Sequence, residues 1–286
     1  MITAKEINSF SEKLGVPTAT IDKDWVLGHL LAGIFNNSYF QEHLIFKGGT
    51  CLKKCYFENY RFSEDLDFTS IHIEKKEIRS NFKKVTPKVD SETGILFGKI
   101  KITDKKFEDN LAAYECSIPF WGANHRKNKK LPPEEKWMSS IKIDFTMHEV
   151  ICLKKEKKKI IHPYSDMLSS HFINSYSIEE IISEKFRALL QRNYAAPRDY
   201  YDLWYITKNI ASIKWEKVAV AFKEKCDHKN ITYKSTKDFF DKNKIISSKR
   251  EWANSLNHHL KSVPPFDDVI ADIKEQIADK KIFPEH

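Results

Sequence analysis

The spacing of apolar residues changes near residue 165, and this change most limits the folds open to the chain. Before it, the segments 65–71, 95–102, 112–120 and 139–146 have the short or alternating apolar patterns of strands. After it, apolar residues recur every three or four positions, which is typical of amphipathic helices. The sequence therefore predicts an α+β protein. We expect a mixed sheet flanked by helices over residues 1–165, followed by a helical domain over residues 166–286.

Helices are also expected around the sheet. Apolar residues at helical spacing predict helices over 5–14 and 20–36, and a short helix is expected over 50–57. The segment 75–88 is ambiguous, and we interpret it as a helix. Ser177 and Glu180 form the pattern of a capping box, which predicts a helix start. A further helix is expected from Pro197 to residue 210, with two or three more before residue 280.

Composition excludes several classes of protein. No apolar run approaches the roughly 20 residues that span a bilayer, and the first residues lack the apolar stretch of a signal peptide. We therefore expect a cytoplasmic protein with no membrane partner. The five cysteines form no CxxC pair, so neither a disulfide framework nor a structural zinc site is expected. The net charge of +8 is concentrated at 126–136 and 154–159, as either polyanion-binding runs or solvated loops.

A short apolar run at 44–46 ends in two consecutive glycines, Gly48 and Gly49. Without side chains, such residues let backbone N–H groups approach an anion, and a helix that follows directs its positive end to the same place. A tight turn with no ligand uses the same residues. The pair is therefore a candidate phosphate site only in combination with other features.

Three aspartates are predicted to share one face of the sheet. Side chains two apart on a strand point the same way, so Asp65 and Asp67 project together while Leu66 and Phe68 pack on the other side. Asp144 has the same relation to apolar neighbours in a second strand. Carboxylates held close together repel unless a cation neutralises them, and Mg²⁺ fits such oxygen ligands. A solvated edge strand is the alternative for the Asp65–Asp67 pair alone.

Charged residues also occur on the inner faces of two helices. Lys185 falls inside the apolar stripe of the helix that begins after Ser177, where an ammonium group needs an anion. That anion is either a structural carboxylate or a phosphate of a ligand. On the next helix Asp199 and Asp202 share a face. Asp199 lies in the first turn, where the helix dipole favours it, so Asp202 is the better functional candidate.

Four short segments stand out when they are taken together. The first two are KGGTCL at 47–52 and RFSEDLDF at 61–68, and the other two are SEKFRA at 183–188 and RDYYDL at 198–203. In this order they resemble the signature of the AbiEii/AbiGii nucleotidyltransferase toxins, which belong to the polymerase β-like nucleotidyltransferase superfamily. The match extends over most of the chain.

The resemblance implies a metal-dependent enzyme that transfers a nucleoside monophosphate from an NTP to an acceptor. It implies that Asp65 and Asp67 hold Mg²⁺ or Mn²⁺, with Asp144 as the candidate third ligand. Catalytic roles fall to these two aspartates, to Lys185 at the triphosphate, and to Asp202 near the acceptor or the base, so the helical domain contributes to the active-site cleft. The residues implied in NTP binding are Lys47, Gly48, Gly49, Thr50, Arg61, Ser63, Arg198 and Asp199.

The same resemblance implies the biological setting. Members of the family block growth by modifying tRNA, which suits the basic charge of this chain, and a cognate antitoxin opposes them without necessarily forming a stable complex. Two alternatives remain open. A metal-dependent nuclease would place a Glu-x-Lys triplet on a strand, whereas the triplet at 134–136 follows two prolines. A nucleic-acid-binding relative of the same fold without activity would not need the acidic pair or Lys185.

Overall fold

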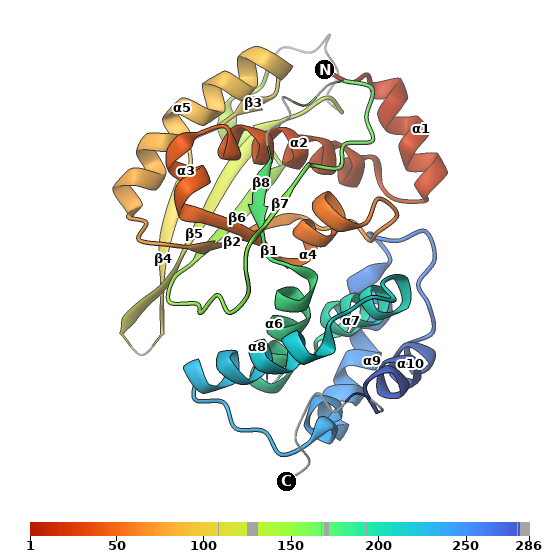
Figure 1. Cartoon of the computed structure of the whole chain (residues 1–286). Helices are drawn as coiled ribbons and strands as arrows, with labels where there is room; N and C mark the ends of the chain where they lie inside the picture. Colours follow the sequence, from red (N-terminus) through yellow and green to blue (C-terminus); the bar gives the residue numbers. More distant parts are fainter. Residues whose placement is uncertain are drawn as a thin grey trace. The chain divides into compact units, whose positions relative to one another are not determined.

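The computed structural model describes residues 1–107, 109–124, 131–166, 168, 172–192, 194–278 and 280 (Figure 1). The chain divides into two compact units. The first, here the sheet unit, comprises Met1–Glu149, Lys155–Ser175 and His259–Lys261. The second, the helical unit, comprises Val150–Lys154, Tyr176–His258 and Ser262–His286. We expected one boundary at residue 165. The chain instead stays in the sheet unit to Ser175, because β8 (Ile173–Ser175) pairs with β1 (Leu44–Lys47).

A mixed eight-stranded sheet organises the sheet unit, and it confirms the predicted fold class. The remaining strands are β2 (Asp65–Ser70), β3 (Leu96–Phe97), β4 (Lys101–Phe107), β5 (Asn110–Trp121), β6 (Ser140–Thr146) and β7 (Glu156–Lys158). Their order is β3-β5-β6-β2-β1-β8-β7, with β4 also paired to β5. The β2–β6 and β1–β8 pairs are parallel, and the other pairs are antiparallel.

Helices cover one face of this sheet. The unit contains α1 (Ala4–Leu14), α2 (Thr18–Phe35), α3 (Ser38–His43), α4 (Gly48–Cys51) and α5 (Lys75–Thr93). Aromatic rings pack between the helices and the sheet. The ring centroids of Phe35 in α2 and Phe68 in β2 are 6.0 Å apart, and those of Phe82 in α5 and Phe145 in β6 are 6.4 Å apart. Alternate residues of a strand point to opposite faces. Asp67 and Asp144, which directly precede Phe68 and Phe145, therefore lie on the other face of the sheet.

The helical unit is built from five helices in the residues described. They are α6 (Ile178–Gln191), α7 (Pro197–Asn209), α8 (Trp215–His228), α9 (Lys242–Leu256) and α10 (Phe266–Ala278), with a 3₁₀ turn at Thr236–Phe240. Phe239 of that turn packs 4.9 Å from Phe186 of α6 and 5.7 Å from Phe222 of α8. Pro197 occupies the first turn of α7, where its missing N–H costs nothing. The predicted helices at 178 and 197 are confirmed.

Some local predictions were wrong. The glycines do not precede the helix expected at 50–57. They begin it, because α4 starts at Gly48 and continues as a π-helical turn, Leu52–Tyr56. The strand expected over 95–102 is divided into β3 and β4, which pair with successive parts of β5. Helix α3 and strands β7 and β8 were not predicted.

The capping box at α6 is only half formed. Ser177 accepts a hydrogen bond from the N–H of Glu180, as predicted. The buried carboxylate of Glu180 is used elsewhere: it accepts from the backbone of Cys152 and Leu153, and it pairs with Lys225 at 2.5 Å. Burial explains the difference, because leaving a buried carboxylate without a cation costs more free energy than a second capping hydrogen bond contributes.

Three further predictions concern the cysteines, the absence of membrane spans and the two basic runs. All five cysteines are free thiols, as expected. None of the helices in the described residues is both long and apolar enough to cross a membrane. The basic run at 154–159 contributes β7. Of the other basic run, 126–136, the part up to residue 130 lies outside the described residues.

Candidate active site

The predicted acidic face is present on neighbouring strands of the sheet unit. Asp67 of β2 and Asp144 of β6 are direct partners in the parallel ladder, and Asp65 lies two positions before Asp67 on the same face. The burial of β2 alternates, so that both aspartates are half-buried while Leu66 and Phe68 are buried. The strand geometry therefore brings all three carboxylates to one face.

The glycines lie directly beside this face. Gly48 follows the last residue of β1 and has a φ of +80°, which an L-residue adopts only with strain. A Cβ atom at Gly48 would lie 2.2 Å from Oδ2 of Asp67. A Cβ at Gly49 would lie 2.6 Å from Nη2 of Arg61 and 3.1 Å from Oγ of Ser63. The absence of two side chains thus makes room for the carboxylate, the guanidinium and the hydroxyl.

Two further candidates connect the glycine turn to the strands. The buried side chain of Thr50 donates a hydrogen bond to the backbone carbonyl of Asp65, so its hydroxyl ties α4 to the start of β2. Lys47 is buried and is the antiparallel partner of Asp67. Both residues therefore position the acidic strand as well as bordering it.

The electrostatics of the face are unbalanced at Asp144. Its Oδ1 atom is buried and has no hydrogen-bond partner in the part of the chain that the structure describes. The ammonium of Lys105 lies 3.9 Å from that atom and pairs more closely with Glu115. Burial raises the pKa of Asp144, the charge of Lys105 lowers it, and Glu115 and Asp65 raise it again. A buried carboxylate oxygen among like charges is costly unless a cation reaches it.

The donor set fits a hard divalent cation, because it consists of carboxylate oxygens. Among the described residues, however, the ligand atoms of the three aspartates do not all lie within 4.8 Å of one another. One group of three residues meets this criterion, and it consists of His29, His162 and Asp166. Two carboxylates with a substrate phosphate are a normal site for Mg²⁺. The adjacent Asp67 and Asp144, or Asp65 and Asp67, meet that smaller requirement.

Two charged residues of this face were not predicted from the sequence. Glu115 of β5 is the ladder partner of Asp144, and Lys105 of β4 reaches both of them. The signal for Glu115 was present, since it alternates with the buried residues Tyr114 and Cys116. Lys105 lies beyond the strand that we expected to end at residue 102.

The candidates of the helical unit form a separate cluster of ion pairs. The ammonium of Lys185 lies 2.6 Å from Oδ2 of Asp202 and 3.1 Å from Oδ1 of Asp199. Asp202 is fully buried, and Asp199 also pairs with Arg192. The sequence left open whether the anion beside Lys185 is a structural carboxylate or a phosphate of a ligand, and the structure shows carboxylates. Nε of Arg198 donates to the backbone carbonyl of Ser255, 3.4 Å away.

Solved structures with the same fold are nucleotidyltransferases by description. MenT4, a nucleotidyltransferase toxin of Mycobacterium tuberculosis H37Rv, is 18% identical with a TM-score of 0.64, covering 97% of this chain and 89% of that one. A nucleotidyltransferase candidate from H. pylori is 17% identical with a TM-score of 0.52, covering 88% of this chain and 90% of that one. At these identities the likeness defines the class of fold.

The family follows from the sequence itself. The family model of the nucleotidyl transferase AbiEii toxins of type IV toxin–antitoxin systems matches residues 29–272, and the chain belongs to that family. The resemblance noted from four short segments is thereby confirmed. The protein is a nucleotidyltransferase of the toxin type, and its family implies an NTP substrate and a cognate antitoxin. No curated protein matches the sequence significantly.

Proposed function

We propose that the protein transfers a nucleoside monophosphate from an NTP to tRNA in a reaction that depends on Mg²⁺ or Mn²⁺. One observation carries the proposal: the carboxylate of Asp67 lies against Gly48, at a position where no other residue would leave it room. Asp144 is its ladder partner. Acidic side chains beside a glycine turn are what a metal-bound triphosphate requires.

The side chains of the sheet unit suggest a division of labour. Asp65, Asp67 and Asp144 would hold the metal, which when bound offsets the charge of the phosphates and of the leaving pyrophosphate. The backbone of Gly48 and Gly49 would cradle the triphosphate, and Arg61 and Ser63, which lie next to Gly49, would be its polar neighbours.

The acceptor hydroxyl must lose a proton as it attacks the α-phosphorus. Asp144 is our candidate for the base, since burial raises its pKa and its Oδ1 has no hydrogen-bond partner among the described residues. In this proposal the oxygen–phosphorus bond of the product forms as the bond to pyrophosphate breaks. The proton passes to a carboxylate of the acidic face.

For the helical unit we propose that Lys185 serves triphosphate binding and Asp202 serves the acceptor or the base. A cognate antitoxin opposes the toxin, and we propose that it does so without a stable complex. A tRNA acceptor suits the net charge of +8, since Lys and Arg contacts to phosphates supply most non-specific affinity for nucleic acid.

Transfer of label tests the proposal. The protein is incubated with each α-labelled NTP, Mg²⁺ and total tRNA, and the RNA is separated by size. We expect labelled RNA of nearly unchanged length. Shortened RNA would instead identify a nuclease, and a gel shift without label or cleavage would identify a binding protein.

Substitutions locate the activity. We expect Asp65→Ala and Asp67→Ala each to abolish label transfer and growth arrest while the protein stays folded. Asp104→Ala is the matched control, because Asp104 lies on β4 opposite Tyr114 and so projects from the other face of the same sheet. Toxicity retained in both Asp65→Ala and Asp67→Ala would count against the proposal.

A further inference from the structure

A second cluster of ligand-type side chains lies in the sheet unit, outside the acidic face. His29 belongs to α2, and His162 and Asp166 belong to the irregular segment that follows β7. One ligand atom of each residue lies within 4.8 Å of the others. Nε2 of His29 is 3.2 Å from Oδ2 of Asp166, and Nε2 of His162 is 2.9 Å from Oδ1. The two rings meet edge to face, with centroids 5.0 Å apart.

These distances suit a metal as well as they suit hydrogen bonds. In a tetrahedral zinc site with bonds of about 2.0–2.1 Å, neighbouring ligand atoms lie about 3.3 Å apart. Both observed N–O separations approach that value, so small shifts of the side chains would accommodate an ion. Two imidazoles and one carboxylate are also a common protein ligand set for zinc, with the fourth position left to water.

Asp166 supplies the formal negative charge of the cluster. It faces two imidazoles, which add no charge in their neutral form. Trp25 donates its indole N–H to both oxygens of Asp166 at 3.1 Å, which adds no formal charge. The cation near the carboxylate is the amino group of Met1, 3.6 Å from Oδ2. Neutral imidazole is the form that binds metals.

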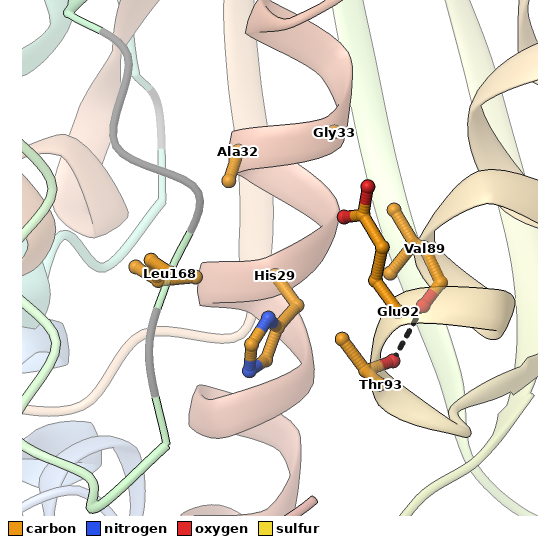
Figure 2. A pocket seen from close by; sticks show the side chains of 7 residues that line it. All are labelled: His29, Ala32, Gly33, Val89, Glu92, Thr93 and Leu168. Carbon is orange, nitrogen blue, oxygen red and sulfur yellow. Dashed lines mark hydrogen bonds between the residues drawn. The ribbon is translucent and has the colours of Figure 1, made fainter.

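The surroundings leave the ligand atoms available. Nδ1 of His162 is buried and has no hydrogen-bond partner among the described residues. Without metal, Nε2 carries the ring proton and donates it to Asp166. When an ion binds, that proton can move to Nδ1, which leaves the lone pair of Nε2 for the ion. His29 also lines a cavity of about 300 Å³, with Glu92 and Thr93 of α5 among the other lining residues (Figure 2). That space can hold a water or a small ligand close to the cluster.

We propose that His29, His162 and Asp166 form a binding site for a zinc-like divalent cation. The site is distinct from the acidic face in chemistry: nitrogen donors select zinc, cobalt or nickel, whereas carboxylates alone select magnesium or manganese. The ion joins the segment 162–166 to the middle of α2. The cluster shares no residue with the acidic face, so the two sites can be tested separately.

Metal binding by the full chain tests this site. The protein is stripped with a chelator, dialysed against micromolar Zn²⁺ or Co²⁺, and assayed for bound metal, for the visible spectrum of bound Co²⁺ and for the thermal midpoint. The same measurements are made on an Asp65→Ala/Asp67→Ala variant, which lacks two ligands of the acidic face. We expect one zinc ion per chain in both proteins, a tetrahedral Co²⁺ spectrum and a higher thermal midpoint with metal.

Substitution of the imidazoles then identifies the ligands. His162→Gln and His29→Gln keep a donor for Asp166 but are poor zinc ligands. Removal of a residue that only hydrogen-bonds to a metal ligand can weaken metal binding by about tenfold. We expect the loss of a ligand itself, in either variant, to weaken zinc binding by more than that. His228→Gln, at the end of α8, is the matched control. If His29→Gln does not fold, His162→Gln decides, because residue 162 lies outside regular secondary structure.

Three results would overturn the proposal. They are absence of zinc binding at micromolar concentration, equal binding by wild type and His162→Gln, and complete loss of zinc in the Asp65→Ala/Asp67→Ala variant. None of these results depends on transferase activity, so the zinc site and the proposed reaction can fail independently.

Discussion

Gly48→Ala is the sharpest test of the acidic face, because the structure gives both its cost and its consequence. The backbone of Gly48 has a φ of +80°, and placing an L-residue there costs about 1–2 kcal/mol. The new methyl group would also lie 2.2 Å from Oδ2 of Asp67, closer than the 3.0 Å that real Cβ atoms respect. The carboxylate must therefore retreat by at least 0.8 Å.

A displacement of about 1 Å at a reacting centre lowers a rate by about 100-fold. We therefore expect Gly48→Ala to lose about 1–2 kcal/mol of unfolding free energy and about 100-fold in label transfer from an α-labelled NTP. Urea denaturation measures the first effect. The second is measured at saturating Mg²⁺, and calorimetry with Mn²⁺ reports whether metal binding falls with it.

Gly94→Ala separates strain from function. Gly94 ends α5 with a φ of +73°, so alanine there carries a similar backbone cost. Its Cβ would meet only the flexible end of Met1, at 2.7 Å. We expect the same loss of stability and unchanged transfer. If Gly48→Ala transfers label as fast as Gly94→Ala, the position of Asp67 over the glycine is irrelevant to the reaction.

Three other outcomes follow from charged side chains. Burial raises the pKa of Asp22 to about 6, so the protonated side chain stabilises the fold at low pH and this contribution is lost as the pH rises through 6. Asp22→Asn should therefore raise the free energy of unfolding, measured in urea, by at most about 3 kcal/mol at pH 8 and by about half of that at pH 5. A gain that does not depend on pH would refute this reasoning. Lys185→Met leaves two buried carboxylates with less compensation and should cost about 3–5 kcal/mol, part of which Asp202→Asn should restore in the double variant. Glu115→Gln releases Lys105 toward Asp144 and should weaken Mn²⁺ binding in calorimetry; unchanged affinity would show that Lys105 does not compete with the metal.

The sequence predicted those parts of the candidate site that depend on local periodicity. Because a strand has a period of two, the spacing of Asp65 and Asp67 was enough to place both on the face opposite Phe68. The helical period likewise placed Lys185 inside an apolar stripe, where it is indeed paired with anions. The anion site expected at Gly48 stays a prediction. The structure shows another reason for glycine at this position, because the carboxylate of Asp67 occupies the space that a Cβ would need.

The rest could not be predicted because it depends on contacts between distant segments. The pairing of β8 with β1 keeps the chain in the sheet unit beyond residue 165, and no local pattern announces which strand a three-residue segment will join. His29 and Asp166 are 137 positions apart in the sequence. Neither lies in a motif, so only the fold brings them together.

The two acidic clusters of this protein differ in how their charge is balanced, and the difference supports a metal at one of them. In the helical unit Asp199 and Asp202 are matched by Lys185 and Arg192, so the chain itself neutralises its buried carboxylates. On the sheet, Asp144 has a buried oxygen that accepts no hydrogen bond from any described residue, and the nearby Lys105 is shared with Glu115. Since an uncompensated buried charge costs several kcal/mol, the sheet gains more from binding a divalent cation than the helices do.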